Sequence, residues 1–312
     1  MDYKKISVLI VTYKQADVIG RNIESILQQK EYGLHEIVIC DDCSPDNNWE
    51  VIQSYVEKYP SIIRAYRNNP NLGIYGNSMK TASLHGDADL YCWLEGDDAL
   101  CDGFFKSVQS FIEQNKIDLT KSVGIFSDYY AISTTGNKVL RKNDFVLRNE
   151  NPLGAFFRNI ATWRASLFSK SVLDNFKPVE LNKGLILAET LFDSQFFYID
   201  EAYYDPIAGS VYYTGIGVSS QWGLCENNSS YKVDDNITRW HYLIENRIIY
   251  KKEDINWAKS SIAYSTCLKK FSIKSLFLYC TYYVKGLRGY RKDYRRLGNE
   301  IKYLIKGCLK RQ

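Results

Sequence analysis

The sequence has few of the residues that would place it in two large classes of protein. Only three histidines occur in 312 residues, and the eight cysteines include one CxxC pair, Cys40 and Cys43. A zinc centre needs four such ligands close together, and a disulfide scaffold needs many cysteines in a short chain. We therefore expect neither, and we interpret the cysteines as small buried residues of a reducing compartment.

Long apolar runs and linkers are also missing. No basic segment followed by an apolar one opens the chain, and SLFLYCTYYV near the C-terminus is too short to span a bilayer. A cytoplasmic location is therefore expected. Residues 1–225 contain no Pro- or Gly-rich linker, internal repeat or low-complexity tract, and we predict that they form one domain.

What the chain does have is an alternation of short β-type apolar runs with helical patterns. This alternation predicts an α/β fold with a parallel sheet covered by helices. The expected strands are residues 6–13, 35–42, 61–67, 88–96, 123–132 and 209–215. Residues 187–199 have apolar positions at helical spacing, so a helix is expected there.

Polar residues gather where three of these strands end. In an open α/β sheet, ligands bind beyond the carboxyl ends of the strands, so the three groups should face one crevice. The residues are Thr12 and Tyr13 after the first strand, Asp41 and Asp42 after the second, and Glu95, Asp97 and Asp98 after the fourth.

The third group places three carboxylates within four positions, where they repel one another. A divalent cation bound between them is the simplest way to offset this repulsion, and hard oxygen ligands suit Mn2+ or Mg2+. Such an ion commonly bridges carboxylates to phosphate oxygens, so the substrate would be a diphosphate. The alternative is a solvated acidic turn in which Gly96 supplies the bend.

The charge of the chain is divided unevenly. Residues 251–312 carry 16 Lys and Arg against 4 Asp and Glu, whereas residues 1–250 carry 24 against 32. In the last segment, basic residues surround an apolar helical stripe: Tyr290, Tyr294, Leu297, Ile301, Leu304, Ile305 and Cys308. We expect residues 286–312 to lie on an anionic membrane surface. Packing on the rest of the protein and closure of an oligomer are the alternatives, and no motif for nucleic acid accompanies the basic residues.

Four segments together resemble the family 2 glycosyltransferases, which have the GT-A fold. They are SVLIVTYKQADVIGRNIESILQQ, EIVICDDCSPDNNWEVI, NPNLGIYGNSMKTA and YCWLEGDDAL, in that order. The resemblance covers about residues 5–220. It implies a Rossmann-like nucleotide-binding sheet within a mixed sheet that has helices on both faces, with its nucleotide-sugar half at about 1–100 and its acceptor half at about 100–225. Residues 226–312 would be a helical C-terminal extension.

The resemblance also implies roles for individual residues. Asp42 would face the base of the nucleotide, and Asp97 and Asp98 would meet the ribose and a metal-bound diphosphate. The full expected sets are Thr12, Tyr13, Asp41, Asp42, Asn77 and Asp97 for the nucleotide, and Glu95, Asp97 and Asp98 for the metal. Glu95 replaces the usual first aspartate. Gly76 replaces an arginine, whose contact with the donor is either absent or supplied by Lys80.

An inverting transfer needs a base that removes the proton of the acceptor hydroxyl. The position that matches the family is Glu189, with Asp193 one helical turn further as the alternative; the other reading of Glu189 is a helix-terminal acid. Trp163 and Arg164 lie where relatives hold the acceptor, where the ring could stack on a sugar and the guanidinium could hold an anionic group. The alternative is ordinary packing of Trp163 as a strand residue, with Arg164 as a surface charge.

These observations predict an inverting glycosyltransferase on the inner face of the cell membrane. It would move a sugar from a nucleoside-diphosphate sugar, with UDP favoured, to a glycan or lipid-linked acceptor in bacterial surface polysaccharide synthesis. A non-catalytic subunit that binds nucleotide-sugar or glycan is the alternative, because Glu95 and Thr190 depart from the family pattern. A nucleotidyltransferase is disfavoured because the Gly- and Arg-rich phosphate loop is missing.

Overall fold

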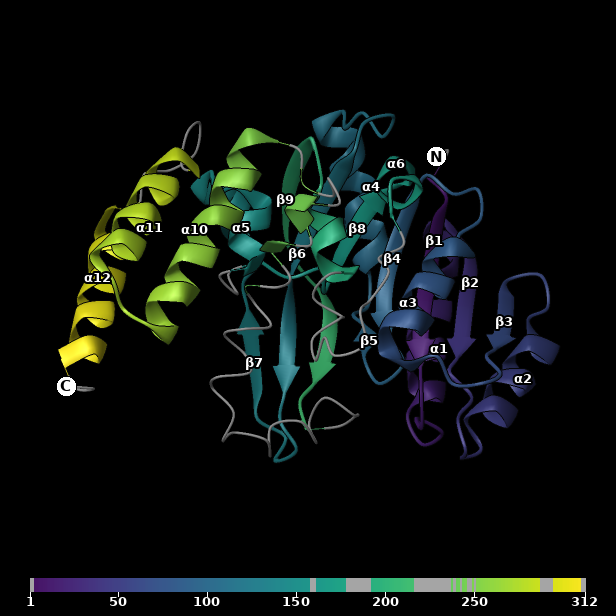
Figure 1. The fold of residues 1–312 in the computed structure, drawn as a ribbon. Helices are drawn as coiled ribbons and strands as arrows, with labels where there is room; N and C mark the ends of the chain where they lie inside the picture. Colours follow the sequence, from purple (N-terminus) through teal and green to yellow (C-terminus); the bar gives the residue numbers. More distant parts are fainter. Residues whose placement is uncertain are drawn as a thin grey trace.

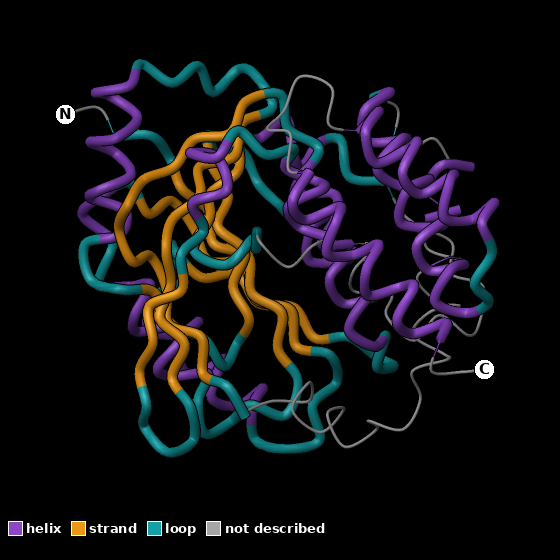
Figure 2. The backbone as a smooth tube through the Cα atoms, turned by 90° about the vertical axis from the view of Figure 1, so that its left-hand side faces the viewer, coloured by secondary structure: helices purple, strands orange, loops and turns teal. Residues whose placement is uncertain are grey.

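The computed structural model describes residues 3–157, 161–177, 192–215, 237, 240–241, 243–245, 249, 251–286 and 294–309. Within them, nine strands form one mixed sheet that lies between helices (Figures 1 and 2). The strands are β1 (Ile6–Thr12), β2 (Leu34–Asp41), β3 (Ile63–Arg67), β4 (Leu90–Glu95), β5 (Ala99–Leu100), β6 (Val123–Ile132), β7 (Lys138–Arg141), β8 (Ser166–Ser169) and β9 (Glu201–Tyr213). The predicted α/β class is confirmed.

The order of the strands creates the crevice that the sequence predicts. The sheet runs β3-β2-β1-β4-β8-β6-β9-β5, and β7 pairs with β6. Strands β1 to β4 are parallel, with β2 on one side of β1 and β4 on the other. The strand order therefore reverses at β1, and the carboxyl ends of β1, β2 and β4 share one edge of the sheet.

Helices cover both faces of the sheet because apolar side chains alternate along the buried strands. On β1, Ile6, Val8 and Ile10 join one hydrophobic cluster, whereas Leu9 and Val11 join another. The first cluster lies under α1 (Ile19–Leu27), α2 (Asn48–Lys58) and α4 (Phe104–Asn115). The second lies under α3 (Gly73–Ser83), α5 (Pro152–Phe157) and α6 (Lys170–Asp174).

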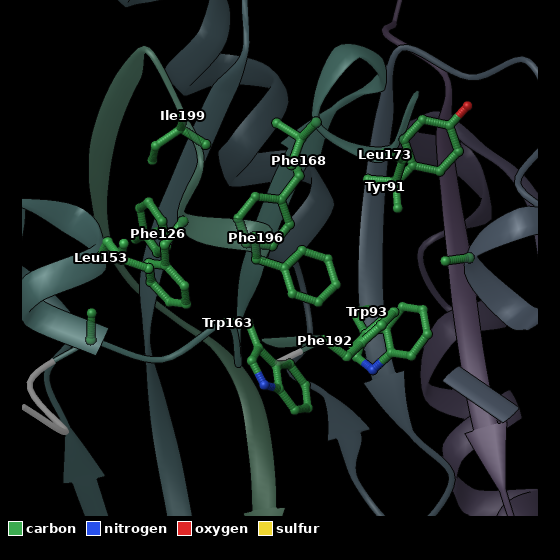
Figure 3. Close-up of a cluster of buried hydrophobic side chains, with 14 of the residues drawn as sticks. Tyr91, Trp93, Phe126, Leu153, Trp163, Phe168, Leu173, Phe192, Phe196 and Ile199 are labelled. Atoms are coloured by element: carbon green, nitrogen blue, oxygen red, sulfur yellow. The ribbon is translucent and has the colours of Figure 1, made fainter. Parts of the chain in front are cut away.

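The second cluster is rich in aromatic rings (Figure 3). It includes Trp93 of β4, two residues before Glu95. Trp93 packs on Phe192 with 4.7 Å between the ring centroids, and Phe168 packs on Phe196 at the same distance. The cluster also takes in four residues beyond position 225: Trp240, Leu243, Ile249 and Ala258. The expected boundary at 225 itself falls outside the described residues.

The second half of the sheet differs in detail from the expectation. Strand β9 has 13 residues, although only residues 209–215 were expected to be a strand, and it pairs with β6 through a register shift near Ser127 and Asp128. Strands β5, β7 and β8 were not predicted, because strands of two or four residues are too short to show a period. Of the helix expected at 187–199, residues 187–191 lie outside the description, residues 192–194 are helical, and Gln195–Phe197 form a 3-10 turn.

Three helices form the C-terminal region: α10 (Lys252–Lys269), α11 (Ile273–Gly286) and α12 (Tyr294–Leu309). They lie together at the end of the molecule opposite β3 (Figure 1). From the stripe expected to face a membrane, Leu297 and Leu304 are buried in a cluster with α10 and α11, and Ile301 packs against it. This part of the stripe is thus covered by protein, as the packing alternative predicted. None of the described helices is both long enough and apolar enough to cross a bilayer.

Candidate active site

The acidic turn after β4 is held in shape by α1. The Asn22 side-chain amide donates to the backbone oxygens of Glu95 and Asp98, at 2.8 and 3.0 Å. Gly96 lies so close to the end of β1 that a Cβ atom there would come within 2.8 Å of Thr12 Oγ1. The Gly96 N–H also donates to the Val11 oxygen at 3.0 Å. The ends of β1 and β4 are therefore joined, and glycine is required where they meet.

The three carboxylates of the turn converge. Oxygen atoms of Glu95, Asp97 and Asp98 lie within 4.8 Å of one another, and both aspartates are buried. Burial, followed by the nearby Glu95 charge, raises the pKa of Asp97 to about 6. The same two causes raise the pKa of Asp98 well above its usual range. Burial is the larger of the two causes, so the ionised form of both aspartates would be stabilised by a nearby cation.

Arg164 is the cation that faces this cluster. Its Nη2 lies 3.0 Å from Glu95 Oε2, and its Nε lies 3.7 Å from Asp98 Oδ2. Its guanidinium also lies 4.2 Å from the centroid of the Tyr212 ring. Burial opposes the charge of Arg164, but Glu95 and Asp98 outweigh it and raise the arginine pKa further. The surface charge considered for Arg164 from the sequence is therefore not what the structure shows.

The cluster fits a divalent cation such as Mn2+ or Mg2+. Three hard carboxylate oxygens converge from one turn. Burial and, after it, the Glu95 charge disfavour the ionised form of both aspartates, and a cation beside them would favour that form. A hydrated cation would take ligands from the set predicted from the sequence.

Asp41 is fully engaged in shaping the loop after β2. Its Oδ1 accepts from the Asn48 side-chain amide at 2.7 Å, and its Oδ2 accepts from the Ser44 N–H at 3.0 Å. Arg67 Nε lies 3.4 Å from the same Oδ2 atom. Asn48 also donates to Thr12 Oγ1 at 3.1 Å. Asp41 and Thr12 are thus tied together across the ends of β1 and β2.

Asp42 faces a different loop. Its Oδ1 accepts from the Asn68 side-chain amide at 2.7 Å and from the Leu72 N–H at 2.8 Å. Asn68 in turn donates to Asn77 Oδ1 at 2.9 Å and accepts from Lys80 Nζ at 2.7 Å. The predicted residues Asp42 and Asn77, together with Lys80, therefore meet at Asn68, which the sequence reasoning did not single out.

The remaining predicted residues have distinct positions. Tyr13 is half-buried at the end of β1. Trp163 is only 4% exposed and lies in the aromatic cluster near Phe196, which corresponds to the packing alternative and leaves no exposed ring face for a sugar (Figure 3). Asp193 is half-buried and close enough to Arg164 to raise its pKa. Glu189 lies outside the described residues.

Two further residues join β9 to the acidic turn. The Tyr213 N–H donates to Asp98 Oδ1 at 3.3 Å, and the Tyr213 ring lies 3.7 Å from the Arg21 guanidinium. Arg21 also donates to the Asp97 backbone oxygen at 2.7 Å.

The sequence contains one signal for the support that α1 gives to the acidic turn. Asn22 is a polar residue within an apolar helical stripe, and such a residue indicates a buried polar contact.

Comparison with known proteins identifies the family to which a chain with this site belongs. The family described as glycosyl transferase family 2 matches residues 7–171. Abequosyltransferase RfbV of Salmonella typhimurium is 34% identical over 111 residues, 35% of this chain and 32% of its own. The poly(ribitol-phosphate) β-N-acetylglucosaminyltransferase TarP of Staphylococcus aureus is 26% identical over 117 residues, 37% of this chain and 35% of its own. The chain thus spans about a third of the length of these curated relatives.

The fold has solved counterparts. Residues 1–349 of S. aureus TarS, in complex with UDP-GlcNAc, match 94% of this chain and 83% of the TarS chain, with a TM-score of 0.59 and 14% identity. That likeness concerns the fold alone and confirms the GT-A architecture. Because the family match covers more than half of the sequence, this chain belongs to glycosyltransferase family 2.

Proposed function

We propose that this glycosyltransferase transfers a sugar, with inversion, from a nucleoside-diphosphate sugar to a glycan or a lipid-linked acceptor of a bacterial surface polysaccharide. The observation that carries the proposal is the convergence of Glu95, Asp97 and Asp98 beside the ends of β1 and β2. UDP is the favoured nucleotide, and the complex of TarS with UDP-GlcNAc supports this choice. Peripheral attachment to the inner face of the cell membrane belongs to the same proposal.

The donor would lie along the shared edge of the sheet. Tyr13 and Asp42 would receive the nucleoside, with Thr12 and Asp41 shaping the wall and Asn77 fixing it through Asn68. When bound, a divalent cation held by the acidic turn would offset the negative charge of the diphosphate. Arg164, adjacent to that turn, would then be able to contact a phosphate or an anionic acceptor.

The reaction would be a single displacement at the anomeric carbon. A base, Glu189 or alternatively Asp193, would remove the acceptor proton as the acceptor oxygen forms its bond to that carbon. The bond from the carbon to the diphosphate would break at the same time, and the nucleoside diphosphate would leave with the electron pair. Attack on the face opposite the leaving group inverts the configuration.

Calorimetric titration with UDP, GDP and dTDP, each with Mn2+ and with EDTA, tests the donor site. Wild type should bind one nucleotide in a Mn2+-dependent way, and Asp98→Ala should lose that binding. Asp205→Ala is the matched control. Asp205 is also buried, but its carboxylate accepts a hydrogen bond from the Ser107 hydroxyl and does not belong to the acidic turn. Equal or absent binding under all conditions would contradict the proposal.

A non-catalytic binding subunit remains the second candidate, and the Arg164 ion pairs are the observation that favours it. An arginine that permanently neutralises the acidic turn would make a cation unnecessary. Glu189→Gln separates the two functions. An enzyme would lose transfer and retain metal-dependent nucleotide binding, whereas a binding subunit would show no transfer in wild type.

A further inference from the structure

Helix α11 carries an apolar stripe that no described residue covers. Ile273 is 82% exposed, Phe277 is 69% exposed and Val284 is 44% exposed. The spacing of four and then seven residues places all three on one side of the helix. At the helical rise of 1.5 Å per residue, the stripe is about 16 Å long. The opposite side of α11, with Tyr279 and Tyr283, is buried against α10 and α12.

The charges around this stripe have one sign. Among residues 251–286 and 297–305, whose side chains the structure describes, every exposed charged side chain is a lysine: Lys252, Lys259, Lys269, Lys270, Lys274, Lys285 and Lys302. The acids described in the same ranges are half-buried or buried, namely Glu253, Asp254 and Glu300. Lys274 and Lys285 lie on the same flank of the stripe, since they are eleven residues, or about three turns, apart on α11.

Charge complementarity favours one of two partners that could cover this stripe, a second copy of the chain or an anionic bilayer. A second copy of this chain would bring like charges together, because residues 251–312 carry 16 basic and 4 acidic residues. An anionic bilayer would instead attract the lysines to its headgroups and receive the apolar side chains just below them. Three exposed apolar side chains form a shallow insertion surface rather than the core of a stable protein interface.

We propose that α11 is the membrane-contacting helix of this protein, with Ile273, Phe277 and Val284 inserted at the headgroup boundary of an anionic bilayer. This differs from the expectation that residues 286–312 provide the contact. Leu297 and Leu304 of α12 are buried within the protein, and of the described stripe only Ile305 is exposed, at 40%. The inference rests on the membrane attachment included in the proposed function and identifies the surface responsible for it.

Sedimentation with vesicles tests the surface. The full chain is mixed with phosphatidylcholine vesicles that contain 30% phosphatidylglycerol, and with pure phosphatidylcholine vesicles. Wild type should bind the anionic vesicles only. Lys274→Glu/Lys285→Glu should weaken the partition coefficient at least 25-fold, at about fivefold for each basic residue removed. Ile273→Ser/Phe277→Ser should weaken it at least tenfold.

Matched controls separate these effects from general changes. Leu147→Ser alters another exposed leucine, 71% exposed, and Lys30→Glu/Lys106→Glu reverses two exposed charges on the sheet domain. Both should bind anionic vesicles as wild type does. Light scattering without lipid would overturn the proposal if wild type were a dimer that Phe277→Ser dissociates. Equal sedimentation of the α11 variants and wild type would also overturn it.

The same preparations distinguish failure of this inference from failure of the proposed function. The α11 variants should bind nucleotide with the affinity of wild type, because none of the altered side chains lies at the acidic turn. If nucleotide binding is normal but vesicle binding is unchanged, the membrane surface is wrong and the donor site stands. If wild type binds vesicles but no nucleotide, the membrane surface stands and the proposed function fails.

Discussion

Replacing Arg164 with methionine tests whether this arginine stands in for a metal ion. Methionine keeps an apolar stem of similar length, and it removes the guanidinium that lies over the Trp163 and Tyr212 rings and faces Glu95 and Asp98. Removing one partner of a buried ion pair typically costs 3–5 kcal/mol. Asp98 already has a raised pKa, so proton uptake would offset part of this loss. We expect Arg164→Met to lose about 3 kcal/mol of the free energy of unfolding in EDTA.

Mn2+ should restore much of that loss, because in wild type the cation must compete with the arginine. We expect the affinity of Arg164→Met for Mn2+, without nucleotide, to exceed that of wild type about tenfold, which corresponds to about 1.4 kcal/mol. Urea unfolding followed by circular dichroism, with saturating Mn2+ and with EDTA, measures the difference between the two conditions.

A second arginine provides the control. Arg64 also forms an ion pair, at 2.7 Å from Glu36, but its side chain is 41% exposed and it is remote from the acidic turn. Arg64→Met should lose at most about 1 kcal/mol, equally with and without Mn2+. If Arg164→Met showed the same loss in Mn2+ as in EDTA, the idea that arginine and metal compete would be refuted.

Two further substitutions follow from buried hydrogen bonds. Asn48→Ala leaves Asp41 and Thr12 without their shared donor, so it should lose about 2–3 kcal/mol in urea unfolding and weaken nucleotide binding in calorimetry. Asp254→Asn should flatten the pH dependence of stability. Burial raises the pKa of Asp254, against an opposing hydrogen bond from Asn151, so its contribution to stability is complete below the unfolded pKa and is lost as the pH rises through the folded value.

Each of these two substitutions has a control that makes the same chemical change at an exposed position. Asn115→Ala removes an exposed amide that caps its own helix and should change stability by less than about 0.5 kcal/mol. Asp118→Asn should affect the pH profile in the opposite sense, because hydrogen bonds from Thr120 lower the pKa of Asp118. A wild-type stability that rises between pH 4 and pH 7 relative to Asp254→Asn would contradict the sign assigned to Asp254.

The first half of the fold could be predicted because its strands are buried on both faces. Strands β1 and β4, and β2 from Ile37 onward, are almost entirely apolar and buried, and each ends at the polar residue at which the sequence pattern changes. Strands β7 and β9 could not be predicted in the same way. All of β7 is exposed and most of β9 is half-buried, so pairing with β6, rather than an apolar pattern, defines their extent.

The candidate site could be predicted as a set of acids but not as a network. Three carboxylates within four positions are visible in a sequence, and they do converge. The partners of these acids come from far along the chain: Arg164 is 69 residues from Glu95, and Asn22 is 73. Nothing in local spacing indicates such contacts, because the topology of the sheet brings them together.

The aromatic cluster under β4 has a consequence for how the molecule unfolds. It contains Trp93, two residues before Glu95, and also Trp240 and Ala258 from the C-terminal part of the chain. The sheet and the first C-terminal helix therefore share one apolar interior, and neither can open without exposing it to water. Melting of this part of the helical region and melting of the acidic turn should accordingly be a single cooperative event rather than two successive ones.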